Sequence, residues 1–152
     1  MIHTVDKIEA AVHQLDWAIR LLIDHDAPIP AITLAGAAEE ILGGSLSGSL
    51  ESAHKILKHN LSSEYQINGT TVSDQHLNKA RNWLKHNDPA SEKTLDLDLL
   101  HQPLQLILRG IYNLYEYDQS RLSQGHRFLA WAVNQNLDAS EIDVIKQLQK
   151  LY

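Results

Sequence analysis

The sequence predicts an all-α protein, because apolar residues recur at three- and four-residue intervals through most of its segments. Its 152 residues suffice for one domain with a single hydrophobic core. No internal repeat, low-complexity tract or linker divides the chain, and Pro and Gly punctuate the helical segments. We therefore expect one domain over residues 1–152, an up-and-down bundle of five to six helices with short connections.

The first helix is expected over residues 4–26, with Thr4 as its N-cap and "APIP" as its break. Its apolar stripe consists of Ile8, Ala11, Val12, Leu15, Ile19 and Leu22. The next segment, "AITLAGAAEEILGG", repeats the spacing and contains small residues that allow close helix packing. Gly43 and Gly44 predict a left-handed stop at its end.

The middle of the chain predicts two shorter helices. One covers about residues 50–59 and is followed by a polar loop over 60–72, in which "NGT" indicates a turn. The other starts at "TVSD" and ends before Pro89. Residues 90–102 include the alternating "TLDLDL", but a lone strand has no pairing partner here, so we expect an extended connector.

Three helices are expected in the last third of the chain. Pro103 suits a first helical position, and the apolar spacing after it predicts a helix to about residue 118. A further helix is expected over residues 121–135. Asp138 and Glu141 form a capping pattern for the last helix.

Composition limits the classes of function. There is no cysteine, which excludes disulfides and zinc-thiolate sites. No segment resembles a signal peptide or a membrane span, so we expect a soluble, cytoplasmic protein. The net charge of −6 opposes broad nucleic-acid binding, and no DNA partner is expected. The segments 54–59 and 78–86 are nevertheless basic and contain no acid.

The candidate catalytic residues form a polar arc on the expected helix over 71–88. In "ARNWLKHNDP", Ala80 and Leu84 face the bundle, while Arg81, Asn82, Lys85 and His86 occupy the opposite arc. Asn82 and His86 are an i,i+4 pair, so we expect them to be neighbours.

This set of residues suits RNA cleavage without a metal. The reaction needs a base for the 2′-hydroxyl, an acid for the leaving oxygen and a cation for the phosphate. Histidine suits the first two roles and arginine the third. One chain offers one such histidine, His86, beside Arg81. Two copies facing each other across a two-fold axis would supply both an acid and a base.

Arg81-Asn82-Trp83-Leu84-Lys85-His86 resembles the R-N-x-x-x-H signature of the HEPN superfamily. The resemblance implies a small all-helical domain, homodimeric, with a composite site between subunits. Many such proteins are metal-independent endoribonucleases of toxin and antiviral systems, so it implies RNA as substrate, Arg81, Asn82 and His86 as catalytic residues, and no metal or cofactor. It covers six residues, within an all-α pattern that fits the whole chain.

The resemblance also leaves a second reading open, a non-catalytic interaction or nucleotide-binding module, since many HEPN-like chains are not nucleases. An antitoxin protein is a possible partner in either case. Some members carry a tyrosine two residues after the histidine as a site of modification by an antitoxin, and Asp88 stands at that position. The bare arginine-histidine spacing recurs at Arg121 and His126, without the asparagine.

Other polar residues suit supporting roles. Glu39 lies at the edge of an apolar stripe, from which it could orient Arg81 or His86, while Glu40 is expected to point away into solvent. A solvated pair of carboxylates is the alternative. Lys85, Lys55 and Lys58 are expected to bind substrate phosphates.

Three further patterns have structural or metal-binding readings. Arg109, Asn113 and Glu116 share one helix face and suggest an internal salt bridge. Glu51 and His54 form E-x-x-H, a di-iron spacing that would need a second copy and two more glutamates, so no metal site is assigned.

Overall fold

The protein is a single array of packed helices. The computed structural model describes residues 1–87, 89–90 and 92–151, and this part of the chain contains no strand. The all-α prediction is therefore confirmed, but the described residues form eight α-helices where five to six were expected. The helical segments are α1 Lys7–His25, α2 Pro28–Gly44, α3 Ala53–Tyr65, α4 Gly69–Thr71, η1 Val72–Leu77, α5 Lys79–Lys85, α6 His101–Asp118, η2 Gln119–Arg121, α7 Gly125–Ala132 and α8 Ala139–Leu151.

The ends of α1 and α2 differ from the predicted caps. Asp6, and not Thr4, caps α1, because its Oδ1 accepts hydrogen bonds from the backbone of Ile8 and Glu9 at 2.9 and 3.0 Å. Asp26 ends α1 in the left-handed region, with φ of 47°. The predicted left-handed stop of α2 is wrong, since Ser45 follows the helix with right-handed backbone angles.

The segment between residues 50 and 72 is more helical than expected. Ser52 caps α3, which continues to Tyr65, so the predicted polar loop is wrong for residues 60–65. The loop was predicted from polarity, but α3 is a surface helix in which only Ala53 is buried. The "NGT" stretch opens the short α4, where Asn68 caps the backbone of Thr70 at 2.8 Å.

The helix that carries the motif is broken where the sequence predicted continuity. Residues 72–77 form the π-helical η1, in which the Asn78 N–H donates to Ser73 O at 2.9 Å. Asn78 then leaves helical geometry, with φ of −124°, before α5 begins. The α5 helix ends at Lys85, earlier than the helix end predicted from Pro89, because the backbone of His86 is already extended.

The C-terminal half largely follows the prediction. Residues 86–100 contain no helix where they are described, in agreement with the expected connector, although α6 starts at His101, two residues before Pro103. Of the predicted helix over 121–135, only Gly125–Ala132 is α-helical, as α7, while η2 ends at Arg121. The capping pattern of α8 is confirmed, since Asp138 Oδ1 accepts from Glu141 N at 2.9 Å and Asp138 N donates to Glu141 Oε2 at 3.1 Å.

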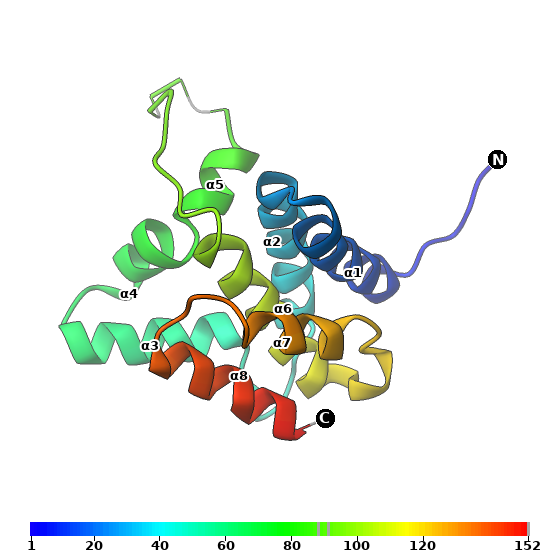
Figure 1. Cartoon of the computed structure of the whole chain (residues 1–152). Coiled ribbons are helices and arrows are strands. Elements are labelled where there is room, and N and C mark those ends of the chain that lie inside the picture. Colours follow the sequence, from blue (N-terminus) through cyan, green and yellow to red (C-terminus); the bar gives the residue numbers. More distant parts are fainter. Residues whose placement is uncertain (88, 91, 152) are drawn as a thin grey trace.

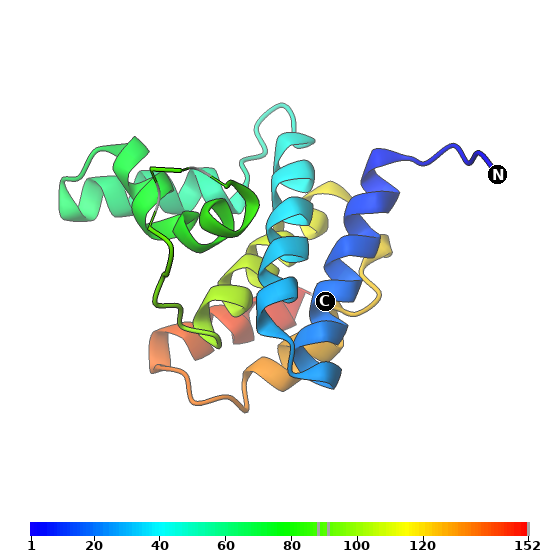
Figure 2. The ribbon, with the colours of Figure 1, turned by 90° about the horizontal axis from the view of Figure 1, so that it is seen from above.

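The hydrophobic core lies among α1, α2, α6, α7 and α8. Small residues line α2, and α1 and α2 run side by side in both views (Figures 1 and 2). The largest fully buried side chains are Phe128, Leu15, Ile19, Ile32, Leu42, Leu104, Leu106, Ile107, Ile111, Leu114, Leu129 and Ile145. Ala80 joins this core from α5, which anchors the motif helix beside α2. Among the described residues, no helix combines the length and apolar character needed to cross a membrane.

Candidate functional site

Arg81 lies across α2, close to its backbone. The side chain of Arg81 is 14% exposed, and its Nη1 donates to Gly36 O at 3.4 Å. A Cβ at Gly36 would stand 2.3 Å from Arg81 Cδ, so the absent side chain of this glycine makes room for the arginine. Asn82 Oδ1 accepts from Arg81 Nη2 at 3.3 Å, which ties the two motif residues together.

Two carboxylates of α2 face the Arg81 guanidinium. Arg81 Nη1 lies 3.4 Å from Glu40 Oε2 and 3.9 Å from Glu39 Oε2. Lys85 Nζ also lies 3.5 Å from Glu40 Oε2. The structure therefore brings Glu39 to Arg81 as expected, and Glu40 is exposed as expected, but its ion pairs with Arg81 and Lys85 were not predicted. Because α5 packs beside the exposed face of α2, a carboxylate that seemed solvated acquires two cationic neighbours.

Glu39 also belongs to a buried polar network. Its carboxylate accepts from Arg109 Nη2 at 3.0 Å, and both side chains are 4% exposed. Arg109 further donates to Asn78 Oδ1 and to Leu77 O, both at 3.0 Å. The salt bridge of Arg109 thus joins α6 to α2, and the prediction of a bridge within α6 is wrong. This network holds the break at Asn78, from which α5 starts.

Asn113 connects the same network to α3. It is fully buried, donates to Glu39 O at 3.1 Å and accepts from Ala53 N at 2.8 Å. The first turn of α3 therefore has a buried partner for one of its otherwise free N–H groups.

His54 lies at the edge of the network and is held by η1. Its Nε2 is 3.3 Å from Ser73 Oγ, and its Nδ1 is enclosed without a hydrogen-bond partner among the described residues. Desolvation by burial is the largest cause that lowers the pKa of His54, and the charge of Arg109 adds to it. The lowered pKa disfavours the charged imidazole, so His54 suits a hydrogen-bonding role better than a phosphate-binding one.

His86 is separated from the other motif residues by the end of α5. It is exposed and leaves helical geometry, with φ and ψ of −115° and 126°. Its backbone N–H still donates to Asn82 O at 3.0 Å, so the two residues remain joined by the last helical hydrogen bond of α5. Trp83 lies between them in sequence and donates to Glu92 O at 2.8 Å, which ties the connector to α5.

The other predicted phosphate-binding residues, Lys55 and Lys58, lie on α3 and not on α5 beside Arg81. Lys55 is exposed on α3 and pairs with Glu51 at 2.7 Å, so the E-x-x-H glutamate is occupied by a lysine. Lys58 lies on the same helix, with its stem near Gly69. Over residues 1–87, 89–90 and 92–151, no three metal-binding side chains converge. Asp88 lies outside the described residues.

A small polar cavity of about 220 Å³ opens beside Arg81. It is lined by Glu39, Glu40, Gly43, Gly44, Ser52, His54, Asn78 and Arg81. Its walls offer carboxylates, a guanidinium, an amide and a hydroxyl. It is smaller than the roughly 300 Å³ at which pockets for drug-sized ligands begin. The cavity can hold a small polar group beside the arginine.

Comparison with known proteins gives no identification. No protein-family model, curated protein or solved structure matches this chain.

Several residues of the site escaped prediction from sequence. Gly36 gave no signal within its helix, since its role depends on an arginine 45 positions away. Asn78 lies inside the predicted helix, although asparagine is often found where a helix is interrupted. Arg109 did give a signal, because a charged residue interrupts the otherwise apolar repeat of its helix.

Proposed function

We propose that this chain is a metal-independent endoribonuclease, acting in the cytoplasm, whose active site forms between two copies. The observation that carries the proposal is the cluster at α5, where Arg81, bound by Asn82, lies in the wall of a polar cavity while His86 is exposed at the helix end. His86 would act as general acid or base, Arg81 would stabilise the phosphate, and Asn82 would orient Arg81.

The second copy supplies the second acid-base group that one chain lacks. A transesterification at RNA needs a base at the 2′-oxygen and an acid at the 5′-oxygen, while His86 alone can provide one of them at a time. Since His86 is exposed, a two-fold related His86 can approach it without rearrangement of the core. A phosphate entering the site would compete with Glu40 for Arg81, because that carboxylate is 56% exposed and can turn toward solvent.

The test is cleavage of diverse RNAs in the presence of a chelator. We expect products that end in a 2′,3′-cyclic phosphate, and no cleavage of DNA, which lacks the attacking hydroxyl. Arg81→Ala and His86→Ala should each abolish cleavage while helicity and dimerisation persist. His25→Ala is the matched control, because His25 is also exposed at the end of a helix. Uncut RNA, or cleavage that survives in the His86 variant, contradicts the proposal.

A second candidate is a non-catalytic module that binds a protein partner such as an antitoxin, or a nucleotide. The pairing of Arg81 with Glu39 and Glu40 favours it, because a guanidinium that already has acidic partners attracts phosphate less strongly. The net charge of −6 acts in the same direction.

The distance between the two His86 side chains in a dimer separates these candidates. The chain has no cysteine, so a His86→Cys variant carries a single thiol for a spin label. A short label-to-label distance is expected for the nuclease, since both imidazoles must reach one phosphate. A monomer, or a long distance, favours the non-catalytic module.

A further inference from the structure

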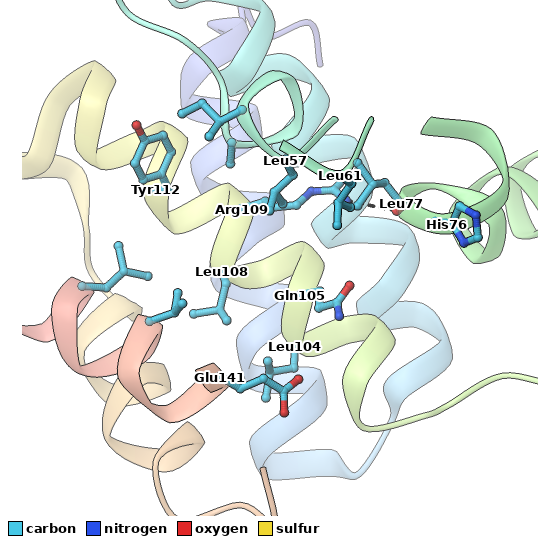
Figure 3. Close-up of a pocket in the computed structure, with 14 residues that line it drawn as sticks. Leu57, Leu61, His76, Leu77, Leu104, Gln105, Leu108, Arg109, Tyr112 and Glu141 are labelled. Atoms are coloured by element: carbon cyan, nitrogen blue, oxygen red, sulfur yellow. Dashed lines mark hydrogen bonds between the residues drawn. The ribbon is translucent and has the colours of Figure 1, made fainter. Parts of the chain in front are cut away.

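An apolar pocket separate from the α5 cluster lies among α3, η1, α6 and α8. Its volume is about 580 Å³, within the roughly 300–1,000 Å³ typical of ligand pockets. Figure 3 draws the lining side chains on these elements, with Leu104, Leu108 and Tyr112 along α6 and His76 to one side. The pocket is lined by Ala53, Ile56, Leu57, Leu61, His76, Leu77, Leu104, Gln105, Leu108, Arg109, Tyr112, Glu141, Val144 and Leu148.

The lining of the pocket follows α6 over two helical turns. Leu104, Leu108 and Tyr112 stand four residues apart on that helix, so the lining extends over about 12 Å at about 1.5 Å per residue. Leu57 and Leu61 repeat this spacing on α3, and α8 contributes a third wall. A pocket with this leucine-rich lining favours an aliphatic chain over a polar molecule.

Arg109 and Glu141, the charged side chains of the lining, are paired within the chain. Arg109 binds Glu39 at 3.0 Å, and Glu141 Oε2 lies 3.5 Å from His101 Nε2. The remaining titratable side chain of the lining, His76, is exposed to solvent, so a charged occupant would be desolvated without a buried counter-ion, at a considerable cost in free energy. The occupant expected from this chemistry is uncharged.

One donor of the lining nevertheless lacks a partner. Arg109 Nε is buried and has no hydrogen-bond acceptor among the described residues, while the two terminal nitrogens of the same guanidinium are engaged. Figure 3 shows this side chain extending from α6 toward Leu77, beneath the leucines of α3. Buried donors without acceptors are rare. A hydrogen-bond acceptor on a bound ligand would give Arg109 Nε its missing partner.

We propose that this pocket binds an aliphatic chain that bears an uncharged, hydrogen-bond-accepting head group, such as a fatty alcohol or amide. The chain would fill the space between α3 and α8, and the head group would accept from Arg109. This inference does not depend on the nuclease proposal, since binding can be measured whether or not the protein cuts RNA.

The test is a titration of the folded full-length protein with decanol, followed by NMR of leucine and valine methyl groups. We expect saturable shifts at Leu57, Leu61 and Leu108, with one decanol bound per chain. Decanoate should bind at least about tenfold more weakly, because its carboxylate would be buried unpaired.

Variants at the mouth of the pocket separate this site from general surface binding. Leu57→Glu and Val144→Glu lie on opposite walls, and both native side chains are partly exposed, at 37% and 51%, so the fold tolerates them. Each should weaken decanol binding by at least about tenfold through lost apolar contact and a new charge. Ile29→Glu is the control, since Ile29 is 47% exposed on α2, outside the lining, and should leave binding unchanged.

Four results would overturn the proposal. They are the absence of saturable methyl shifts, equal weakening by the Ile29 control, decanoate binding as tight as that of decanol, and pocket signals that change when the protein is diluted without decanol. The last result would assign the pocket to a second copy of the chain.

Discussion

Glu39 is the residue on which the buried polar network depends. It is the acidic partner of Arg109 and a neighbour of Arg81, and its side chain is 4% exposed. Glu40 follows it in sequence but is 56% exposed, so the charges of these two adjacent glutamates have different roles. The buried carboxylate organises the network, whereas the exposed one only shares its charge with Arg81 and Lys85.

Glu39→Gln should lower the free energy of unfolding by about 3–5 kcal/mol, because it leaves the charge of Arg109 buried without its partner. Glu40→Gln is the matched control and should change it by less than about 0.5 kcal/mol. Urea unfolding of the two variants measures the difference. Equal effects would mean that the Arg109 pair contributes nothing specific to stability.

At the scale of elements, the position of the α5 cluster depends on how closely α5 approaches α2. Gly36 allows the stem of Arg81 to lie against the α2 backbone, and the adjacent Ala80 is buried in the core. Gly44 belongs to the same helix, but a Cβ there would meet nothing within 4 Å. Gly44 is therefore a control in which an added methyl group makes no contact with Arg81.

Gly36→Ala should displace Arg81 from α2 and separate its guanidinium from Glu39 and Glu40. A gain in helix propensity of up to about 1 kcal/mol would offset part of the cost, so the variant should fold. NMR signals of the Arg81 Nε–H group should move in this variant and stay in place in Gly44→Ala. An unchanged Arg81 signal in both variants would contradict the close approach.

His101 connects the start of α6 to α8 through charge. Desolvation lowers its pKa, but the hydrogen bond with Asp98 at 2.8 Å and the charges of Asp98 and Glu141 outweigh this, and the net pKa is raised above 6.5. A raised pKa in the folded state means that these contacts stabilise the fold fully below the unfolded value and are lost as pH rises through the folded one.

His101→Gln should therefore destabilise the protein more at about pH 5.5 than at about pH 8.5. Urea unfolding of both proteins at the two pH values measures this. A loss that is equal at both, or larger at the higher pH, would show that the charge of His101 does not stabilise the contact with α8.

At the scale of the whole molecule, the helices differ in how firmly they are held. The α1, α2 and α6 helices bury long apolar stripes in the core, whereas α3 buries only Ala53 and turns its leucines toward the apolar pocket. In Figure 1, α3 lies at the side of the molecule, away from α1. Local opening requires least free energy where buried apolar contacts are few.

Among the helices longer than ten residues that precede α7, α3 should show the fastest amide hydrogen exchange. We expect its central amides to exchange through local opening, while those of α2 and α6 exchange only with larger unfolding. Exchange measured by NMR or mass spectrometry tests this. Equal protection of α3 and α2 would mean that α3 is held by contacts other than those described.

The sequence by itself determined the helical class, most of the helix positions, the cap of α8 and the cluster of Arg81 with Asn82. These follow from spacing and capping residues, which act within a few positions of the chain. Only the tertiary structure decided which acids face Arg81, where Arg109 finds its partner, and that α5 is separated from η1 at Asn78. Those features depend on side chains that meet across 30 to 70 positions of the chain, and helical periodicity carries no information about such distant pairs.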